Sequence, residues 1–320
     1  NNQMINPLGS GLMSFFIDGA RTLLVSGTRS SGKTSFLGSL LVEIMRKYRI
    51  ILLEDTLELP SQALRELGYN IQNMKVRSAL TSGGTEVGAD EGIRASLRMG
   101  DSSLIVGEIR SKEALALFEA MRIGALAIVV AGTIHGASPY GVFDRVVNDL
   151  GVPKTSFKAT DIIVITNPVK TAGGLKSFRR VHSITEVRKH WQDDPLREKG
   201  FVDLMKYNTK TDKLEPTDEL INGDSEILKK IAGNVKEFAG DWDAVWDNIL
   251  LRAKMKETLV NYANKFMLYD LLEARSVIES NDMFHRISES VREEVGSLDS
   301  KRIYQEWEDW FKRYMREKKG

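Results

Sequence analysis

The sequence contains no cysteine, and this absence removes several classes of protein from consideration. Without cysteine there is no disulfide scaffold, no thiolate nucleophile and no zinc or iron–sulfur site with cysteine ligands. An excess charge of one sign is also lacking, because 45 basic residues stand against 44 acidic residues in 320. No global field therefore draws the chain to nucleic acid or anionic lipid, and we expect neither zinc nor a nucleic-acid partner.

A long apolar run is lacking as well. The longest stretch without a formal charge, 123–143, contains glycine and polar residues and is purely apolar only over 125–131. This pattern predicts a buried strand followed by a polar loop rather than a membrane span. The first residues also lack the basic start and apolar run of a signal peptide. Because the sequence begins at Asn1 without a methionine, we expect a fragment.

Charge divides the chain into two parts. Residues 1–170 carry 34 charged side chains, whereas residues 171–320 carry 55 together with all five tryptophans. This shift indicates an α/β core followed by a more solvated, mostly helical extension. We therefore expect a first domain over 1–190, a strand and linker region over 191–226 and a helical C-terminal extension over 227–320.

Short, β-branched and almost uncharged runs alternate with helical stretches in the first part. Such runs are typical of parallel strands covered on both faces, and their alternation with helices predicts a doubly wound, mostly parallel sheet. The expected strands are 22–26, 50–53, 104–106, 128–131, 162–166, 176–189 and 200–208, and the expected helices are 33–48, 112–123, 227–238, 242–274 and 301–319. The polar stretch 208–226 is interpreted as an exposed connection.

One motif carries specific chemistry. Residues 27–34 read Gly-Thr-Arg-Ser-Ser-Gly-Lys-Thr and match the phosphate loop G-x-x-x-x-G-K-[ST], between a predicted strand and a predicted helix. Glycine permits close backbone approach, and the exposed N–H groups with the helix N-terminus bind phosphate oxygens. Lys33 is expected to reach the β- and γ-phosphates, and the Thr34 hydroxyl to ligate Mg²⁺. The expected nucleotide-binding residues are Gly27, Thr28, Arg29, Ser30, Ser31, Gly32, Lys33, Thr34 and Ser35.

Carboxylates follow two other predicted strands. Glu54 follows the strand 50–53, and Glu108 comes shortly after 104–106. Because the carboxyl ends of parallel strands open onto one edge, both are expected beside the phosphate loop. A carboxylate there can hold Mg²⁺ or orient an attacking water. The alternative for each is an N-cap or a surface ion pair.

Three arginines and one histidine are further candidates. Arg94 and Arg98 lie four apart on a predicted helix, and Arg110 comes two residues after Glu108. Arginines near a γ-phosphate stabilise charge in the transition state, although each of these could instead pair with a nearby carboxylate. His135 follows a buried strand, which favours a phosphate-sensing role over a structural one. His182, His190 and His285 show no metal-ligand spacing and are interpreted as structural.

The order of these motifs resembles the type II/IV secretion ATPase superfamily, and most closely its archaeal branch. Four segments carry the resemblance over roughly residues 5–190: the Walker A loop, a segment like the family's Asp box, one like its Walker B and one like its His box. In order they are Gly27–Thr34, Glu54-Asp55-Thr56-Leu57-Glu58, Gly107-Glu108-Ile109-Arg110 and Thr133-Ile134-His135-Gly136.

The resemblance implies a RecA-like P-loop ATPase core and a hexameric ring with ATP between subunits. Such motors serve type IV pili, archaella and secretion systems, act on a membrane-embedded platform protein, and work in the cytoplasm at the inner face of the membrane. By position, Lys33 and Thr34 would bind phosphate and Mg²⁺, Glu108 would activate water and Glu54 would support the metal. Arg94, Arg98 and Arg110 would stabilise charge within or across subunits, and His135 would report nucleotide state.

Three departures from the family pattern stand beside this resemblance. Only 26 residues precede the phosphate loop where relatives carry another domain, Ala125 replaces the histidine of a Gly-His pair, and a tetra-cysteine element is absent. Three other functions remain alternatives: a RecA-like motor that translocates nucleic acid, a nucleotide-binding assembly scaffold without hydrolysis, and a P-loop metabolite kinase. The His-box segment and the large extension give the kinase little support.

The last predicted helix carries an apolar stripe. Its members follow helical spacing, and they are Ile303, Trp307, Trp310, Phe311 and Tyr314. We expect the stripe to pack against the extension's own helices. The alternative is a docking helix for a membrane platform or an anionic membrane surface.

Overall fold

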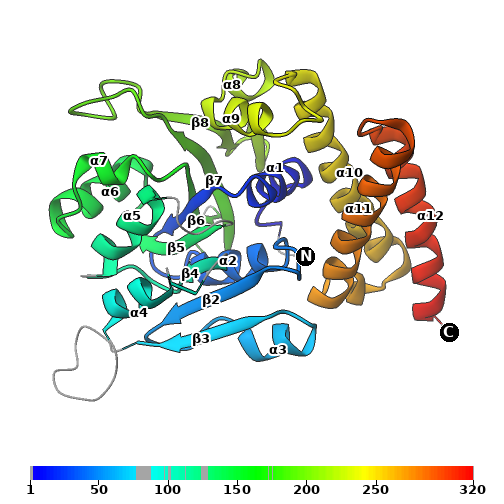
Figure 1. The fold of residues 1–320 in the computed structure, drawn as a ribbon, viewed down its shortest axis with the longest axis horizontal. Helices are drawn as coiled ribbons and strands as arrows, with labels where there is room; N and C mark the ends of the chain where they lie inside the picture. The colour runs from blue at the N-terminus through cyan, green and yellow to red at the C-terminus, as the bar shows by residue number, and fades with distance from the viewer. Residues whose placement is uncertain are drawn as a thin grey trace.

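A mixed sheet with helices on both faces forms the body of the protein, and a group of long helices lies at one end (Figure 1). The computed structural model describes residues 3–76, 88–96, 98–99, 102–111, 113–123, 129–171, 173–174 and 176–319. The expected α/β fold with a mostly parallel sheet and a helical C-terminal region is confirmed.

The described strands form one nine-stranded sheet with the order β3-β2-β4-β5-β1-β6-β7-β8-β9. The pairings from β3 to β6 are parallel, and those from β6 to β9 are antiparallel. The strands are β1 (Thr22–Gly27), β2 (Arg49–Glu54), β3 (Ile71–Lys75), β4 (Ser102–Val106), β5 (Val130–His135), β6 (Ile162–Lys170), β7 (Ser177–Val187), β8 (Phe201–Asn208) and β9 (Lys213–Pro216).

The predicted strands correspond to β1, β2, β4, β5, β6, β7 and β8. Strand β3 was not expected, because its sequence Ile-Gln-Asn-Met-Lys is polar, as suits a strand at the edge of the sheet. Residues 112 and 124–128 lie outside the described residues. They include the first residue of the predicted helix 112–123, the first residue of the predicted strand 128–131, and Ala125.

Ten of the described helices and helical turns lie before residue 240, and their bounds follow the strand connections. They are α1 (Pro7–Asp18), α2 (Lys33–Leu41), α3 (Ser61–Glu66), α4 (Ala89–Ser96), α5 (Glu113–Ile123), α6 (Pro139–Asp144), η1 (Arg145–Asp149), α7 (Lys154–Phe157), α8 (Asp218–Ile221) and α9 (Glu226–Asn234). The C-terminal elements are α10 (Trp242–Phe266), η2 (Tyr269–Leu272), α11 (Ala274–Val295) and α12 (Ser300–Lys319).

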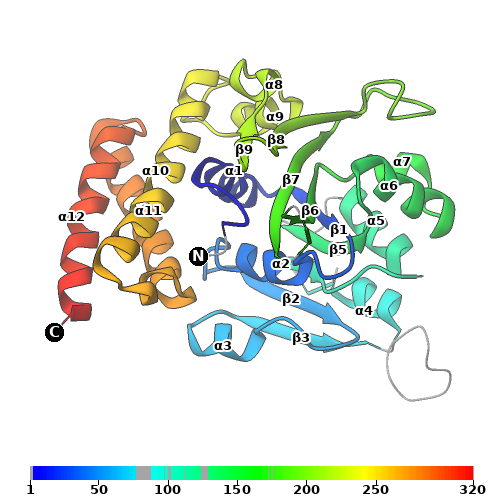
Figure 2. The same cartoon turned by 180° about the vertical axis from the view of Figure 1, so that it is seen from behind.

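Two apolar cores lie on opposite faces of the sheet because side chains alternate along each strand. In β1, Leu23 and Val25 face the core shared with α1, α2, α9 and α10. Leu24 faces the core shared with α4, α5, α6 and α7. Figure 2 shows the helices of the first core, α1, α2, α9 and α10, from behind. The sheet is therefore covered on both faces, which explains the near-continuous apolar sequence of its central strands.

Helix α1 precedes the phosphate loop and was not expected from the sequence. Its N-terminus is fixed by Asn6, whose side chain accepts a hydrogen bond from the Gly9 N–H at 2.9 Å. A Cβ atom at Gly11 would lie 2.8 Å from the Ile249 carbonyl oxygen, so glycine permits close contact between α1 and α10. This contact ties the start of the described chain to the C-terminal helices.

The C-terminal helices pack on one another through the predicted stripe. Ile303, Trp307 and Phe311 of α12 are fully buried in a third core with α10 and α11. The expected packing is thus confirmed, and these three side chains are not available for docking. Among the described residues, no helix combines the length and apolar character needed to cross a membrane.

Two expectations for the second half were wrong, and one helix was not predicted. The stretch 208–226 is more than an exposed connection, because it contains β9 and α8 with buried Leu214 and Leu220. The expected helix 242–274 ends at Phe266, after which Met267 adopts a left-handed conformation with φ 55°. Helix α11 was not expected. Strands β8 and β9 extend the sheet beyond residue 190, and the division at 190 and 226 stays a prediction.

Candidate functional site

The carboxyl ends of four neighbouring parallel strands bring the predicted site residues to one edge of the sheet. Gly27 ends β1, Glu54 ends β2, Glu108 comes two residues after β4, and His135 ends β5. Because β2, β4, β5 and β1 are consecutive in the sheet, segments far apart in the sequence meet here.

The phosphate loop has the backbone that its glycines require. Gly32 adopts φ +92° at the N-cap of α2, a conformation that favours glycine. A Cβ atom at Gly27 would overlap the Thr166 carbonyl oxygen of the adjacent strand β6. The Ser31 hydroxyl lies 2.9 Å from the Thr166 hydroxyl, so the loop is held against β6.

Lys33 is folded back into its own loop. Its Nζ donates hydrogen bonds to the carbonyl oxygens of Gly27 at 3.2 Å and Thr28 at 3.1 Å, and lies 3.4 Å from Nδ1 of His135. Burial lowers the pKa of the Lys33 ammonium, while the Glu108 carboxylate acts in the opposite direction. Thr34 is half-buried, whereas the side chains of Thr28, Arg29, Ser30 and Ser35 are exposed.

Glu108 lies at the centre of a polar network beside Lys33. Its Oε1 lies 2.9 Å from Nε2 of His135, and its Oε2 pairs with Arg110. Arg110 also lies 3.3 Å from Asp55. Burial, followed by the nearby Lys33, lowers the pKa of His135 and favours its neutral imidazole. The hydrogen bond with Glu108 raises the pKa of Arg110.

The position of Glu108 is fixed by neighbouring backbone. The Thr133 hydroxyl of β5 donates to the Gly107 carbonyl oxygen at 2.6 Å, and the Ile109 N–H donates to the Thr133 carbonyl oxygen at 2.8 Å. On the other side, Glu113 accepts hydrogen bonds from the N–H groups of Arg110 at 2.5 Å and Ser111 at 2.8 Å. These contacts hold the loop that carries Glu108 and Arg110.

Glu54 has different surroundings. It is only 3% exposed, and its Oε1 accepts hydrogen bonds from the N–H groups of Glu58 and Leu59, each at 3.0 Å. Its Oε2 is buried without a hydrogen-bond partner among the described residues. One oxygen therefore shapes the loop after β2, whereas the other has no hydrogen-bond partner within the described residues.

Arg94 and Arg98 do not join this network. Arg94 lies on α4, whereas Arg98 lies beyond the end of that helix at Ser96, so the expectation of a shared helix was wrong. Both side chains are exposed, and neither forms an ion pair within the described part of the chain. Arg110 is the predicted arginine that contacts the site.

Two residues near the loop were missed by the sequence reasoning. Arg179 of β7 donates a hydrogen bond to the Ser30 carbonyl oxygen at 3.0 Å, and the Asn167 side chain of β6 accepts from the Thr28 N–H at 3.3 Å. No motif marks them, because they reach the loop through the lateral order of β1, β6 and β7.

The remaining histidines have structural surroundings. His182 stacks on Tyr207 with ring centroids 5.0 Å apart, and His190 Nε2 lies 2.8 Å from the Glu198 carbonyl oxygen. His285 lies 3.5 Å from Asp18, and burial lowers its pKa. No group of three or more metal-ligating His, Cys, Asp or Glu side chains occurs among the described residues.

A family model and several known proteins match much of this chain. Residues 9–192, more than half of the chain, match the family model described as type II/IV secretion system protein. The chain is 28% identical over 237 residues to the uncharacterized protein MJ1287 of Methanocaldococcus jannaschii, covering 74% of this chain and 80% of that one. It is 29% identical over 184 residues to VirB11 of Agrobacterium fabrum, covering 57% of this chain and 51% of that protein.

The chain therefore belongs to the type II/IV secretion system protein family. A solved structure with a similar fold is the VirB11 ATPase from the Brucella suis type IV secretion system in complex with sulphate. The TM-score is 0.42 at 19% identity, and the match covers 54% of this chain and 50% of that one. The chain thus spans about half the length of the VirB11 proteins that it matches.

Proposed function

We propose that this protein hydrolyses ATP as a subunit of a ring-shaped motor in a type II/IV secretion-like machine. One observation carries the proposal: Glu108 stands at the same sheet edge as the phosphate loop, joined to Lys33 through His135 over 2.9 Å and 3.4 Å. A scaffold that only binds nucleotide needs the loop but not this carboxylate. A motor of this family would use the free energy of ATP hydrolysis, a reaction that requires both the phosphate loop and Glu108.

The roles of the side chains follow from their positions. Lys33 donates hydrogen bonds to carbonyl oxygens of its own loop. When nucleotide binds, the ammonium exchanges these for phosphate oxygens, because a hydrogen bond to an anionic phosphate oxygen is stronger than one to a neutral carbonyl oxygen. Glu108 accepts a hydrogen bond from the attacking water and orients it. Arg110 holds Glu108 and offers positive charge near the γ-phosphate, which is transferred to the water as ADP leaves.

The residues present also fit Mg²⁺. Thr34 supplies a half-buried hydroxyl, and Oε2 of Glu54 is a buried carboxylate oxygen that accepts no hydrogen bond within the described structure. Glu108 supplies a second carboxylate, whose Oε1 lies 2.9 Å from Nε2 of His135. These hard oxygens are ligands that Mg²⁺ prefers, directly or through water. When bound, the ion neutralises charge on the β- and γ-phosphates.

The first experiment measures turnover and binding in two variants. Lys33→Ala should remove hydrolysis and weaken nucleotide binding sharply, because Lys33 contacts the bound ground state. Glu108→Gln should keep nucleotide binding and lose turnover, because Glu108 acts on the attacking water. ATPase rates and fluorescent-nucleotide titration measure both properties. Near-normal turnover in Glu108→Gln would contradict the role given to Glu108.

The ring is tested by mass and by subunit mixing. A hexamer that forms with an ATP analogue and Mg²⁺ is expected in native mass measurements. If Arg94, Arg98 or Arg110 acts across a subunit boundary, mixing its alanine variant with Lys33→Ala subunits should recover activity, because some interfaces regain both groups. The double variant in one chain should stay inactive. No recovery with any arginine would contradict a role across the boundary.

The proposed setting is the cytoplasmic face of a membrane, with a membrane-embedded platform protein as partner. The family membership supports this setting, and pilus, archaellum and secretion machines are the candidate assemblies. The test is co-purification of the candidate platform protein with the Glu108→Gln variant in ATP, which should retain more partner than the same variant without nucleotide.

A further inference from the structure

A cavity lies at the opposite edge of the sheet from the phosphate loop. Its volume is about 480 Å³, and its lining includes Thr22 and Val130, the first residues of β1 and β5, and Asp161, which directly precedes β6. Strands of this length span about 20 Å, so the cavity is separate from the candidate nucleotide site. No motif or proposed role above includes it.

The described side chains around this cavity are strongly biased towards positive charge. Five cationic side chains and a single carboxylate line it: Arg21, Arg122, Lys158, Lys189, Lys230 and Asp161. Like charges in one concave region repel one another, and a cavity wall of low dielectric strengthens that repulsion.

Asp161 neutralises only part of this charge. Its carboxylate lies 3.2 Å from Lys189 and 3.8 Å from Arg21, and it accepts a hydrogen bond from the Thr22 N–H at 3.3 Å. Its side chain is 11% exposed, so little of it remains accessible. One carboxylate is thus shared between two cations, and Arg122 and Lys230 form no ion pair within the described residues.

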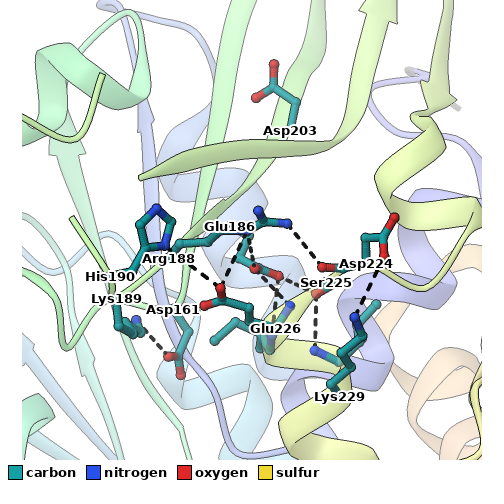
Figure 3. Close-up of polar contacts among 12 residues, drawn as sticks. Asp161, Glu186, Arg188, Lys189, His190, Asp203, Asp224, Ser225, Glu226 and Lys229 are labelled. Atoms are coloured by element: carbon teal, nitrogen blue, oxygen red, sulfur yellow. Dashed lines mark hydrogen bonds and ion pairs between the residues drawn. The ribbon is translucent and has the colours of Figure 1, made fainter. Parts of the chain in front are cut away.

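Tertiary structure fixes the cations in place. Lys158 donates a hydrogen bond to the Trp191 carbonyl oxygen and lies 4.6 Å from the centre of the Trp191 ring. Lys189 follows β7, which runs antiparallel to β6 and therefore ends at the amino-terminal edge of that strand. Figure 3 shows Lys189 directed towards Asp161.

A buried carboxylate on β7 anchors helix α9 and thereby brings Lys230 to the cavity. Glu186 of β7 is fully buried and accepts hydrogen bonds from the Ser225 hydroxyl and from the N–H groups of Glu226 at 3.0 Å and Ile227 at 3.3 Å (Figure 3). A carboxylate at a helix N-terminus is stabilising, so the first turn of α9 is fixed to the sheet. Lys230, one turn further along α9, is held at the rim.

We propose that this cavity binds a phosphate group. A tetrahedral anion of up to two charges matches cations that converge from several elements better than a planar, singly charged carboxylate does. Burial lowers the pKa of Lys189, and Lys230 acts in the same direction against the opposing effect of Asp161, so a bound anion would favour the charged ammonium. The phosphate can belong to a free phosphorylated compound or to an anionic lipid headgroup.

The test uses the Lys33→Ala protein, so that the phosphate loop contributes little to binding. The pocket variant adds Arg122→Glu and Lys230→Glu, both at exposed side chains. The matched control adds Lys301→Glu and Arg313→Glu on α12, which are exposed, change the net charge equally and lie at the other end of the molecule (Figure 1). Thermal unfolding checks that both variants fold as the parent does.

Two probes distinguish the sources of phosphate. Inorganic phosphate is titrated calorimetrically at constant ionic strength, and vesicles of phosphatidylcholine with phosphatidic acid are compared with pure phosphatidylcholine vesicles by co-sedimentation. The pocket variant should weaken binding at least about tenfold, because it reverses two charges at the site, while the control stays near the parent. Binding of phosphate alone indicates a free compound, and binding of vesicles alone indicates a headgroup.

Other outcomes would overturn the proposal. They are binding of neither probe by the parent, equal losses in the pocket and control variants, and preferential binding of an acidic peptide such as polyglutamate. Equal losses would mean that only the overall charge matters, and peptide preference would mean that the cations recognise carboxylates on a protein partner.

Discussion

Truncating Trp307 to alanine should be one of the most destabilising single changes in the C-terminal helices. The indole is fully buried, stacks on Phe311 with centroids 5.2 Å apart, and donates its N–H to the Ser280 carbonyl oxygen at 3.3 Å. Removing a buried tryptophan typically costs about 3–5 kcal/mol, and the stacking and hydrogen bond favour the upper half of that range.

Trp310 is the matched control because it lies on the same helix and undergoes the same chemical change. Its side chain is only half-buried and stacks on Tyr314 with centroids 5.3 Å apart. We expect Trp310→Ala to cost about 1 kcal/mol, near the centre of the distribution for single substitutions. The two variants should therefore differ by at least about 2 kcal/mol in the free energy of unfolding, well beyond any difference in helix propensity.

Urea unfolding followed by far-ultraviolet circular dichroism measures this difference without relying on tryptophan fluorescence. With a slope of about 3 kcal/mol per molar urea, Trp307→Ala should lower the midpoint by about 1 M or more. Equal midpoints for the two variants would refute the packing argument. A Trp307→Ala protein of normal stability that no longer associates with membranes would support the docking interpretation instead.

Three further predictions concern the site and its pH dependence. Glu54→Gln should lower the free energy of unfolding by about 2 kcal/mol, because two hydrogen bonds lose their charged acceptor. Glu108→Gln should lower it by under about 1 kcal/mol. Equal unfolding midpoints for the two variants would contradict this prediction. Gly27→Ala should abolish nucleotide binding because its Cβ overlaps a carbonyl oxygen of β6, while Gly233→Ala on α9, with open space around it, should bind normally. Burial depresses the pKa of His285, so its contribution to stability is present above the unfolded pKa of about 6.5 and is lost as pH falls through the folded value. His285→Gln should flatten the decline of the thermal midpoint below that pH, and an unchanged slope would rule His285 out as its cause.

Local patterns in the sequence were sufficient for the central strands and for the phosphate loop. Strands β1, β2, β4, β5 and β6 are apolar on both faces because both are covered, so each shows as a short uncharged run. The loop 27–34 is recognisable because its glycines, lysine and threonine act within one turn of chain.

Elements whose stability comes from distant partners were harder to predict. Strand β3 is polar and depends on pairing with β2, and β9 depends on pairing with β8. Helix α1 and helix α11 were missed, although α1 packs closely on α10 through Gly11. Local propensity is a weak guide where tertiary packing supplies most of the helix stability.

The sequence by itself determined the presence of a phosphate loop, of carboxylates after strands and of an α/β core, because these depend on neighbouring residues. Only the tertiary structure decided that Glu108 meets His135 and Arg110, that Glu54 uses one oxygen for its own loop, and that Arg98 lies beyond its expected helix. It also decided that lysines and arginines from five separate segments converge on one cavity, at the edge of the sheet opposite the phosphate loop. The physical reason is that strand order, strand direction and helix anchoring set these distances, and none of the three is encoded in a local pattern.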